Sequence, residues 1–334
     1  MQRPKNWWHK REPVPTARRA EQGFDAGRVA GFLYGGGSEG CEPAHAVPSA
    51  TYSVPPSVAR FTMPEFQLPS RPDISLYYEL SGATSAPLVV LLNGMSQSTA
   101  NWRTQARKMA ERFQVLSYDA RCQGRSTVVD EPLTLDDHAL DLRDLLDHLQ
   151  ARHVVLVGFS HGARVALHTA PLLGARCVGL SLTGTGSDGD AMREVIVRSW
   201  REVLHRGGIE ALAWCTIPDI LGRVYLESLR GQWEPMVRAT VQRNDAVGLG
   251  RLLEGLAGYA GPEEDARQIG CPTQLLSGRE DLLVSIESAQ RLAALLHDCQ
   301  HVVFEHVGHT LPIEAPEAWR AQVDAFLLRV TAHL

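Results

Sequence analysis

A serine between two glycines is the first candidate for chemistry in this sequence. Residues 158–162 read Gly-Phe-Ser-His-Gly, the pattern G-x-S-x-G with Ser160 at its centre. An apolar strand pattern at 154–157 precedes the motif, and a helical pattern at 163–173 follows it. The two glycines permit a sharp turn in which larger side chains would collide. We therefore predict that Ser160 is a nucleophile on a tight turn at the start of a helix.

A serine hydroxyl needs a base to remove its proton, and histidine is the usual choice. His309 lies late in the chain, after a strand pattern at 301–305 and before a helical pattern at 316–330. The base occupies this place in the chain order serine, acid, histidine. Among the 13 histidines, His306 is the main rival because it lies closer to the same strand pattern. We predict that His309 is the base.

A carboxylate is expected to orient the histidine and to stabilise its protonated form. Asp281 comes directly after a strand pattern at 273–277 and precedes a helical pattern. Its neighbour Glu280 remains an alternative, and Asp188 or Asp190 could serve in a rearranged triad. We predict that Asp281 is the third member.

Two backbone N–H groups are expected to bind the oxyanion that forms when a serine attacks a carbonyl group. One belongs to His161, the residue after the nucleophile, and the other to the loop after the strand pattern at 88–92. That loop begins at Asn93, and Met95 is in position to supply the second N–H. We also expect Asn93 to contribute to substrate binding.

These residues are distributed over a chain in which strand and helix patterns alternate from residue 65 onward. Such alternation indicates right-handed βαβ units and a mostly parallel sheet flanked by helices. Two of the strand patterns, at 88–92 and 154–157, are apolar without alternation, as expected for strands covered on both faces. The strand patterns lie at 75–80, 88–92, 114–118, 153–158, 177–182, 273–277 and 301–305. The helical patterns lie at 100–113, 136–149, 161–173, 286–296 and 316–330. The sequence therefore predicts an α/β fold.

The alternation is interrupted once, after residue 184, by a stretch with helical patterns only. Helices inserted between two strands of a parallel sheet commonly cover the carboxyl ends of the strands, where ligands bind. We therefore predict a helical cap at about residues 188–262. Its apolar side chains, with Trp214 and Ile217 among them, are expected to bind substrate.

Residues 1–62 differ in composition from the rest of the chain. They are rich in proline and glycine and contain few large apolar side chains. Such a segment buries too little apolar surface to offset an ordering entropy of about 1–2 kcal/mol per residue. We expect a disordered extension over 1–62 and one folded domain over 63–334.

Composition excludes several classes of protein. The formal net charge is −5 and the isoelectric point is near 6.2, which argues against nucleic-acid binding. The apolar runs are far shorter than the roughly 20 residues that a membrane helix needs. The six cysteines have no C-x-x-C spacing, so they predict free thiols and a cytoplasmic location.

The order and spacing of Ser160, Asp281, His309 and the loop at Asn93 resemble those of the α/β-hydrolase superfamily over about residues 66–334. Residues 119–126 read Asp-Ala-Arg-Cys-Gln-Gly-Arg-Ser and are similar to the family's turn D-x-R-G-x-G-x-S, with Cys122 in place of a glycine. The Asn93-Gly94 dipeptide and the helical cap are similar to the acyltransferases that join 3-hydroxyacyl chains into rhamnolipid precursors. The resemblance implies an α/β-hydrolase fold with a helical cap inserted after the sixth strand.

The resemblance also implies a function. We expect a serine hydrolase that acts on a carboxylic ester or thioester through a Ser-His-Asp triad and an acyl-enzyme intermediate. A serine nucleophile excludes relatives that use aspartate, such as haloalkane dehalogenases and epoxide hydrolases. The alternatives are an acyltransferase that joins hydroxyacyl chains and a non-catalytic receptor with this fold; carbon–carbon bond hydrolysis and lactone opening also remain open. No metal or other cofactor is implied, the expected partner is a small-molecule acyl substrate, and the oligomeric state stays open.

Overall fold

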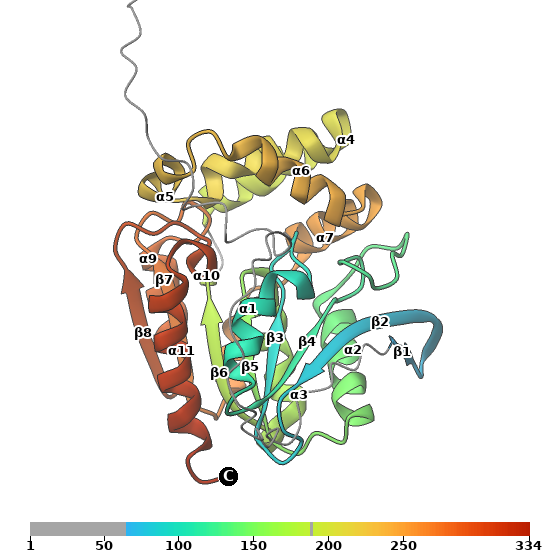
Figure 1. The fold of residues 1–334 in the computed structure, drawn as a ribbon, viewed down its shortest axis with the longest axis vertical. Coiled ribbons are helices and arrows are strands. Elements are labelled where there is room, and N and C mark those ends of the chain that lie inside the picture. The colour runs from blue at the N-terminus through green and yellow to red at the C-terminus, as the bar shows by residue number, and fades with distance from the viewer. Residues whose placement is uncertain (1–64, 188–189) are drawn as a thin grey trace, which may run out of the picture. The chain divides into compact units, whose positions relative to one another are not determined.

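The computed structural model describes residues 65–187 and 190–334, which form an eight-stranded sheet with helices on both faces (Figure 1). The strand order is β1-β2-β4-β3-β5-β6-β7-β8. The strands are β1 (Glu65–Leu68), β2 (Arg71–Ser81), β3 (Leu88–Leu92), β4 (Gln114–Tyr118), β5 (Val154–Phe159), β6 (Cys177–Thr183), β7 (Thr273–Gly278) and β8 (Cys299–Phe304). The predicted α/β-hydrolase fold is confirmed. The disordered extension expected at 1–62 lies outside the described residues.

Parallel pairing brings the ends of the strands that carry candidate residues to one edge of the sheet. Strands β3 to β8 are parallel to one another, and Leu92 at the end of β3 pairs with Gly158 near the end of β5. The end of β5 pairs in turn with the end of β6, where Phe159 lies opposite Thr183. The loops that follow these strands therefore converge, as ligand-binding loops do in open α/β sheets.

Two layers of helices cover the sheet. One apolar cluster joins Val89 and Leu91 of β3 to α1 and α11, with Trp102 and Trp319 fully buried between them. The alternate residues of β3 belong to the cluster on the other face, where α2, α3 and α9 pack. Strand β3 is therefore apolar throughout because both of its faces are buried. The helices of the two layers are α1 (Thr99–Met109), α2 (Leu135–His148), α3 (His161–Leu173), η2 (Gly174–Arg176), α8 (Glu263–Gln268), α9 (Ile286–Ala293), α10 (Leu311–Glu314) and α11 (Pro316–Thr331).

The first two strands differ most from the sequence-based prediction. Strand β2 is longer than the predicted strand at 75–80, and β1 was not predicted at all. The two strands form an antiparallel pair at the edge of the sheet, and β2 is antiparallel to β4. The amino-terminal part of β2 is largely exposed and polar, so it carries no run of apolar residues from which a strand could be recognised.

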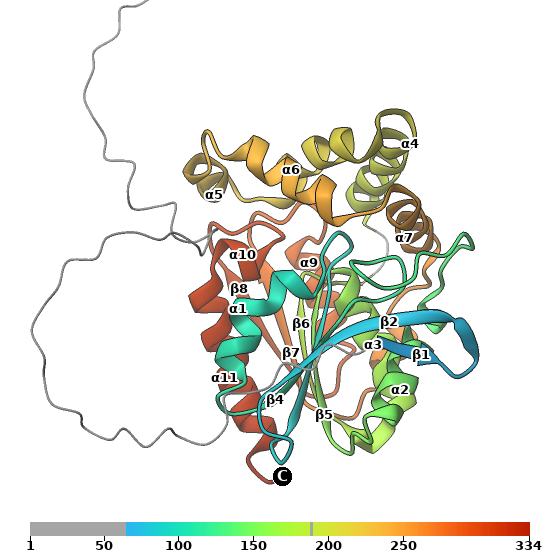
Figure 2. The same cartoon turned by 45° about the vertical axis from the view of Figure 1, so that its right-hand side comes forward.

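The predicted insertion of helices lies between β6 and β7. It consists of α4 (Ala191–Ile220), α5 (Arg223–Ser228), α6 (Trp233–Arg243) and α7 (Ala246–Gly258). Figures 1 and 2 show these helices beyond the carboxyl ends of the strands, as a cap. Helix α4 is kinked at Gly208, whose φ is 75°, so the chain follows two helical segments there. Although α4 has 30 residues, no helix within the described ranges is both long and apolar enough to cross a membrane.

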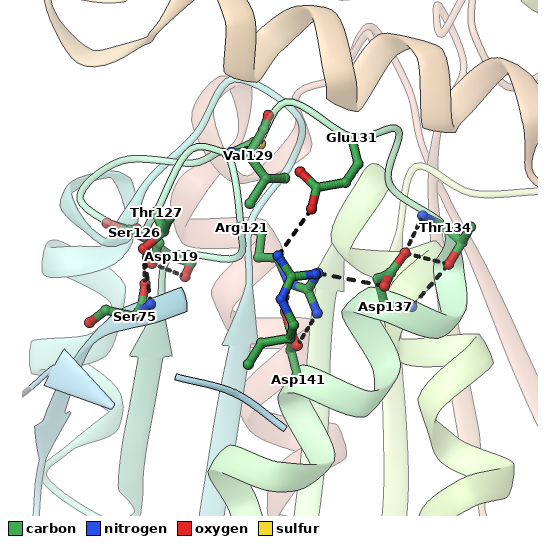
Figure 3. A network of polar contacts seen from close by, with 12 residues as sticks. Ser75, Asp119, Arg121, Ser126, Thr127, Val129, Glu131, Thr134, Asp137 and Asp141 are labelled. Carbon is green, nitrogen blue, oxygen red and sulfur yellow. Dashed lines mark hydrogen bonds and ion pairs between the residues drawn. The ribbon is translucent and has the colours of Figure 1, made fainter. Parts of the chain in front are cut away.

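The loop between β4 and α2 is fixed by a buried ion pair. Arg121 donates two hydrogen bonds to the Asp141 carboxylate, at 2.6 and 2.7 Å, and its guanidinium lies 3.5 Å from Asp137 (Figure 3). Only 8% of the Arg121 side chain and 4% of the Asp141 side chain is exposed.

Cys122, which replaces a glycine of the D-x-R-G-x-G-x-S turn, has a φ of 65°. It therefore keeps the left-handed backbone conformation that glycine adopts most readily.

Candidate active site

The G-x-S-x-G motif forms the tight turn between β5 and α3. Ser160 has φ 52° and ψ −113°, an uncommon conformation for a residue with a side chain. A Cβ atom on Gly158 would lie 2.6 Å from the Cα atom of Ala163, and one on Gly162 would lie 2.4 Å from the carbonyl oxygen of Leu92. Any larger residue at either position would therefore force the turn open.

Three side chains meet beside this turn. The Nε2 atom of His309 lies 2.8 Å from Ser160 Oγ, and its Nδ1 atom lies 2.8 Å from Asp281 Oδ2. The other carboxylate oxygen, Oδ1, accepts the backbone N–H groups of Leu283 and Val284 at 2.8 and 3.0 Å. The side chains of His309 and Asp281 are 4% and 0% exposed. The imidazole is therefore held with one nitrogen toward the acid and the other toward the hydroxyl.

Among the described residues, the alternatives for base and acid do not join this group. His306 is exposed, and its Nδ1 atom lies 3.8 Å from the Glu280 carboxylate, so these two alternatives contact each other. Asp190 caps α4 by accepting the N–H of Met192 at 3.1 Å. Asp188 lies outside the described residues.

The two predicted oxyanion donors are the backbone N–H groups of Met95 and His161. Met95 lies in the loop after β3, and His161 directly follows Ser160. His161 is the first residue of α3, where an amide has no acceptor within the helix. In the part of the chain that the structure describes, neither amide donates to another group. Gly94 allows the loop of Met95 to approach the turn, because a Cβ atom there would lie 2.7 Å from the Phe159 ring.

A glutamine that the sequence analysis missed holds the Met95 loop. Gln123 is 2% exposed, and its Nε2 atom donates to the carbonyl oxygens of Gly94 and Met95 at 2.9 and 3.2 Å. Gln97 supports the same loop, since its Oε1 atom accepts the Gly94 N–H at 3.0 Å. Nothing in the residue pattern indicates this role, which depends on β3 and β4 being neighbours.

The side chain of Asn93, which we predict to bind substrate, is buried among protein groups. Asn93 is 3% exposed, and its Nδ2 atom donates to the Tyr118 carbonyl oxygen at 2.9 Å and to Gln123 Oε1 at 3.3 Å. Its Oδ1 atom accepts the indole N–H of Trp102 at 2.8 Å. Both ends of the amide are therefore occupied by protein groups, and the side chain supports the ends of β3 and β4.

We expect Asn93→Ala to lower the free energy of unfolding by about 2–4 kcal/mol and to leave KM nearly unchanged. The substitution leaves the buried Trp102 N–H without its hydrogen-bond acceptor. Denaturant unfolding and steady-state kinetics measure the two effects. The matched control is Asn101→Ala, since Asn101 is exposed and only accepts the N–H of Ser98; we expect a loss of about 1 kcal/mol or less. If Asn93→Ala keeps the wild-type stability and raises KM, the Asn93 side chain binds substrate and does not support the fold.

The side chain of His161 is buried between His138 of α2 and Tyr259, the residue after α7. It is 2% exposed, its Nε2 atom lies 3.0 Å from the Tyr259 hydroxyl, and its ring packs edge-on against His138 at 4.8 Å between centroids. Burial, with a smaller contribution from the charge of Arg164, lowers the pKa of His161 to about 4. Burial also lowers the pKa of His138 well below its ordinary value. Both rings are therefore neutral at pH 7.

We expect the protein to lose stability between pH 7 and 5. The folded-state pKa of His161 lies below the unfolded value of about 6.5, so the unfolded chain binds the proton more readily as the pH falls. His161 then contributes a loss of about 2 kcal/mol over this range. Unfolding titrations at both pH values should show a loss about 2 kcal/mol smaller in His161→Gln than in the wild type, because the buried His138 contributes to the loss in both proteins.

A histidine of a different kind makes a control necessary for this pH experiment. The pKa of His168 is lowered by burial, but hydrogen bonds to Asp136 and Asp265 outweigh this and raise it, so His168 stabilises the fold as the pH falls. The net slope therefore mixes opposite contributions, and only the difference between variants is informative. The same substitution at an exposed position, His153→Gln, is the control for the change of residue itself. Equal slopes in the wild type and His161→Gln would contradict the prediction.

Two residues that the sequence analysis assigned to substrate binding lie in the second half of α4. Ile217 is 8% exposed and packs in a small apolar cluster within the cap, together with Leu221 and Val237. Trp214 is 40% exposed. These environments favour internal packing for Ile217 and leave Trp214 as a surface aromatic residue of the cap.

A cavity of about 950 Å³ lies between α4 and α7. Charged side chains of both signs line it, among them Arg198, Arg201 and Glu254, and Tyr259 also forms part of its wall. Through Tyr259 the cavity adjoins His161, although Ser160 is not among its lining residues. The cavity does not select one charge, since arginines and carboxylates face it together.

Residues 89–322 match the family model described as the alpha/beta hydrolase family. Because this match covers more than half of the chain, the protein belongs to that family, and it is an enzyme of the alpha/beta hydrolase class.

Known proteins with similar sequences or structures share this assignment. The chain is 26% identical over 245 residues to the putative carbamate hydrolase RutD of Escherichia coli, a match that covers 71% of this chain and 89% of that protein. A thermophilic esterase from Thermogutta terrifontis has a similar fold, with a TM-score of 0.72, 24% identity and coverage of 81% of this chain and 99% of the other. The enol-lactonase from Burkholderia xenovorans is similar, with a TM-score of 0.68, 23% identity and coverage of 79% and 99%.

Proposed function

We propose that the protein is a serine hydrolase that cleaves a carboxylic ester or thioester through an acyl-enzyme intermediate. The observation that carries the proposal is the pair of 2.8 Å contacts that join Ser160 to His309 and His309 to Asp281. A hydroxyl, an imidazole and a buried carboxylate in this order are the groups that acyl transfer requires. We assign the reaction to the cytoplasm on the basis of the five described free thiols.

In the first half of the reaction, Ser160 Oγ attacks the carbonyl carbon of the substrate while His309 Nε2 takes the hydroxyl proton. The carbonyl oxygen becomes negatively charged and accepts hydrogen bonds from the N–H groups of Met95 and His161. Asp281 stabilises the imidazolium through Nδ1. When the tetrahedral intermediate collapses, His309 gives its proton to the leaving alcohol or thiol, and the acyl group stays on Ser160.

In the second half, His309 takes a proton from water as the water oxygen attacks the acyl carbon. His309 then returns the proton to Ser160 Oγ as the bond between Oγ and the acyl carbon breaks, which releases the acid. A hydroxyl compound in place of water would accept the acyl group instead, which is the acyltransferase alternative. The same residues serve both acceptors, so water exclusion beneath the cap determines the outcome.

A panel of substrates tests this proposal. It contains p-nitrophenyl esters from acetyl to decanoyl, acyl-CoA thioesters, a lactone and an aryl carbamate; the last two represent the reactions named for the similar enol-lactonase and for the similar putative carbamate hydrolase. We expect turnover of at least one ester or thioester. Turnover of the lactone or the carbamate alone would redirect the substrate class, and no turnover of any member would contradict the proposal.

A further inference from the structure

Glu314, the last residue of α10, makes four hydrogen bonds around His309. Its Oε2 atom accepts the N–H groups of Gly308 and Gly222, each at 2.9 Å. Its Oε1 atom accepts the N–H group and the hydroxyl of Thr310 at 3.0 and 2.9 Å. One carboxylate thus binds the amides immediately before and after His309. We call these four residues, Glu314, Gly308, Gly222 and Thr310, the Glu314 cluster.

One member of the Glu314 cluster, Gly222, belongs to the cap. A Cβ atom on Gly222 would lie 2.8 Å from both Glu314 Oε2 and the Gly308 nitrogen, and one on Gly308 would lie 2.4 Å from the Gly222 nitrogen. The N–H of His309 itself donates to the carbonyl oxygen of Ile220 at 2.9 Å. The cap and the histidine loop are therefore in direct backbone contact, with no room for a side chain between them.

Helix capping explains only half of these contacts. Thr310 is the residue before α10, so its two bonds to Glu314 would stabilise the start of a short helix in any context. Gly308 and Gly222 lie outside α10, and a cap of this helix does not need them. Hydrogen bonds to a carboxylate are stronger than hydrogen bonds between neutral groups. Those of Gly308 and Gly222 join α10, the loop of His309 and the cap next to His309.

We propose that Glu314 is a positioning residue of the active site. It holds residues 307–310 against the cap, so that His309 stays within hydrogen-bonding distance of both Ser160 and Asp281. Glu314 acts through His309 and does not touch the reacting atoms. The proposal deepens the serine hydrolase function proposed above and rests on it. A displacement of about 1 Å in such a group costs about a hundredfold in rate.

The direct test is Glu314→Gln, which keeps the shape but turns an NH₂ group toward donors. We expect kcat to fall about 10- to 100-fold and KM to stay within about twofold. In addition, the NMR signal of the His309 Nδ1–H proton, assigned by its loss in His309→Ala, should shift or broaden. The matched control is Glu317→Gln, because Glu317 is an exposed carboxylate that accepts from Lys108 and Arg320; it should keep the wild-type kcat and signal.

A purely structural role would lower the melting temperature and leave kcat and the NMR signal of the folded protein unchanged. That result in Glu314→Gln would overturn the proposal. The NMR measurement is independent of turnover. If the wild type cleaves no substrate and Glu314→Gln still changes the His309 signal, the positioning role is supported and the proposed function is contradicted. If the wild type cleaves a substrate and Glu314→Gln changes neither kcat nor the signal, the proposed function is supported and the positioning role is contradicted.

A second variant keeps the test decisive if Glu314→Gln fails to fold. Gly222→Ala places a methyl group against Glu314 Oε2 and Gly308, whereas a Cβ atom on Gly270 meets nothing within 4 Å. We expect Gly222→Ala to lower kcat and to change the His309 signal, and Gly270→Ala to do neither. Wild-type kcat and signal in Gly222→Ala would overturn the proposal.

Discussion

Ser160→Ala is expected to lower kcat about a millionfold, because no other hydroxyl is presented to His309 Nε2 at this turn. The residual rate should come from the oxyanion donors and from substrate binding alone. Steady-state kinetics on whichever ester or thioester the wild type turns over measures the loss.

The fold should survive this substitution. The hydroxyl of Ser160 contacts His309, and alanine loses only that contact. We expect the melting temperature and the near-ultraviolet circular dichroism spectrum to remain close to those of the wild type. A Ser160→Ala protein that is folded and keeps more than about 1% of wild-type kcat would contradict the assignment of the nucleophile.

Asp281→Asn is expected to have the second largest effect, a fall in kcat of about ten-thousandfold. If the asparagine Oδ1 atom keeps its bonds to the N–H groups of Leu283 and Val284, its NH₂ group faces His309 Nδ1. The imidazole must then carry its proton on Nε2, where it cannot accept the proton of Ser160. Kinetics at pH 7 to 8 measures this loss.

Glu280→Gln separates the two adjacent carboxylates. Glu280 Oε2 accepts the N–H of Arg223 at 2.7 Å and has no contact with His309 among the described hydrogen bonds. We expect kcat to fall no more than about threefold in this variant. An equal loss in Glu280→Gln and Asp281→Asn would mean that the acid of the triad is wrongly assigned.

The parallel part of the fold was predictable because its strands are buried on both faces. Strands such as β3 and β5 are apolar at every position, and the helices between them repeat apolar residues at helical spacing. The edge strand β1 was not predictable in the same way. Its two buried residues, Phe66 and Leu68, alternate with exposed ones over four positions, which is too short a pattern to be distinctive.

The site also contains some residues that the sequence indicates and others that it does not. Ser160, Asp281 and His309 follow strands at the edge where parallel strands end, so chain order and strand position were sufficient to propose them. Gln123 and Glu314 were missed because their roles depend on tertiary neighbours: Gln123 reaches the loop after β3, and Glu314 reaches the cap. Residue type alone carries no sign of such contacts.

Asn93 depends on tertiary neighbours in the same way. Its place at the end of β3, directly before the oxyanion loop, suggested contact with substrate. Its amide instead has partners on Trp102 and Tyr118, neither of which is near it in the sequence. The hydrogen-bond partners of a polar side chain beside an active site distinguish support of a loop from contact with substrate, and the sequence alone does not give them.

The most direct test of the central claim is the site of covalent labelling by a fluorophosphonate, which reacts with serines activated by a neighbouring base. The labelled protein is digested, and the modified residue is located by mass spectrometry. We predict stoichiometric labelling of Ser160 in the wild type, and none in Ser160→Ala or His309→Ala. An unlabelled wild type, or a label on any other residue, would contradict this prediction.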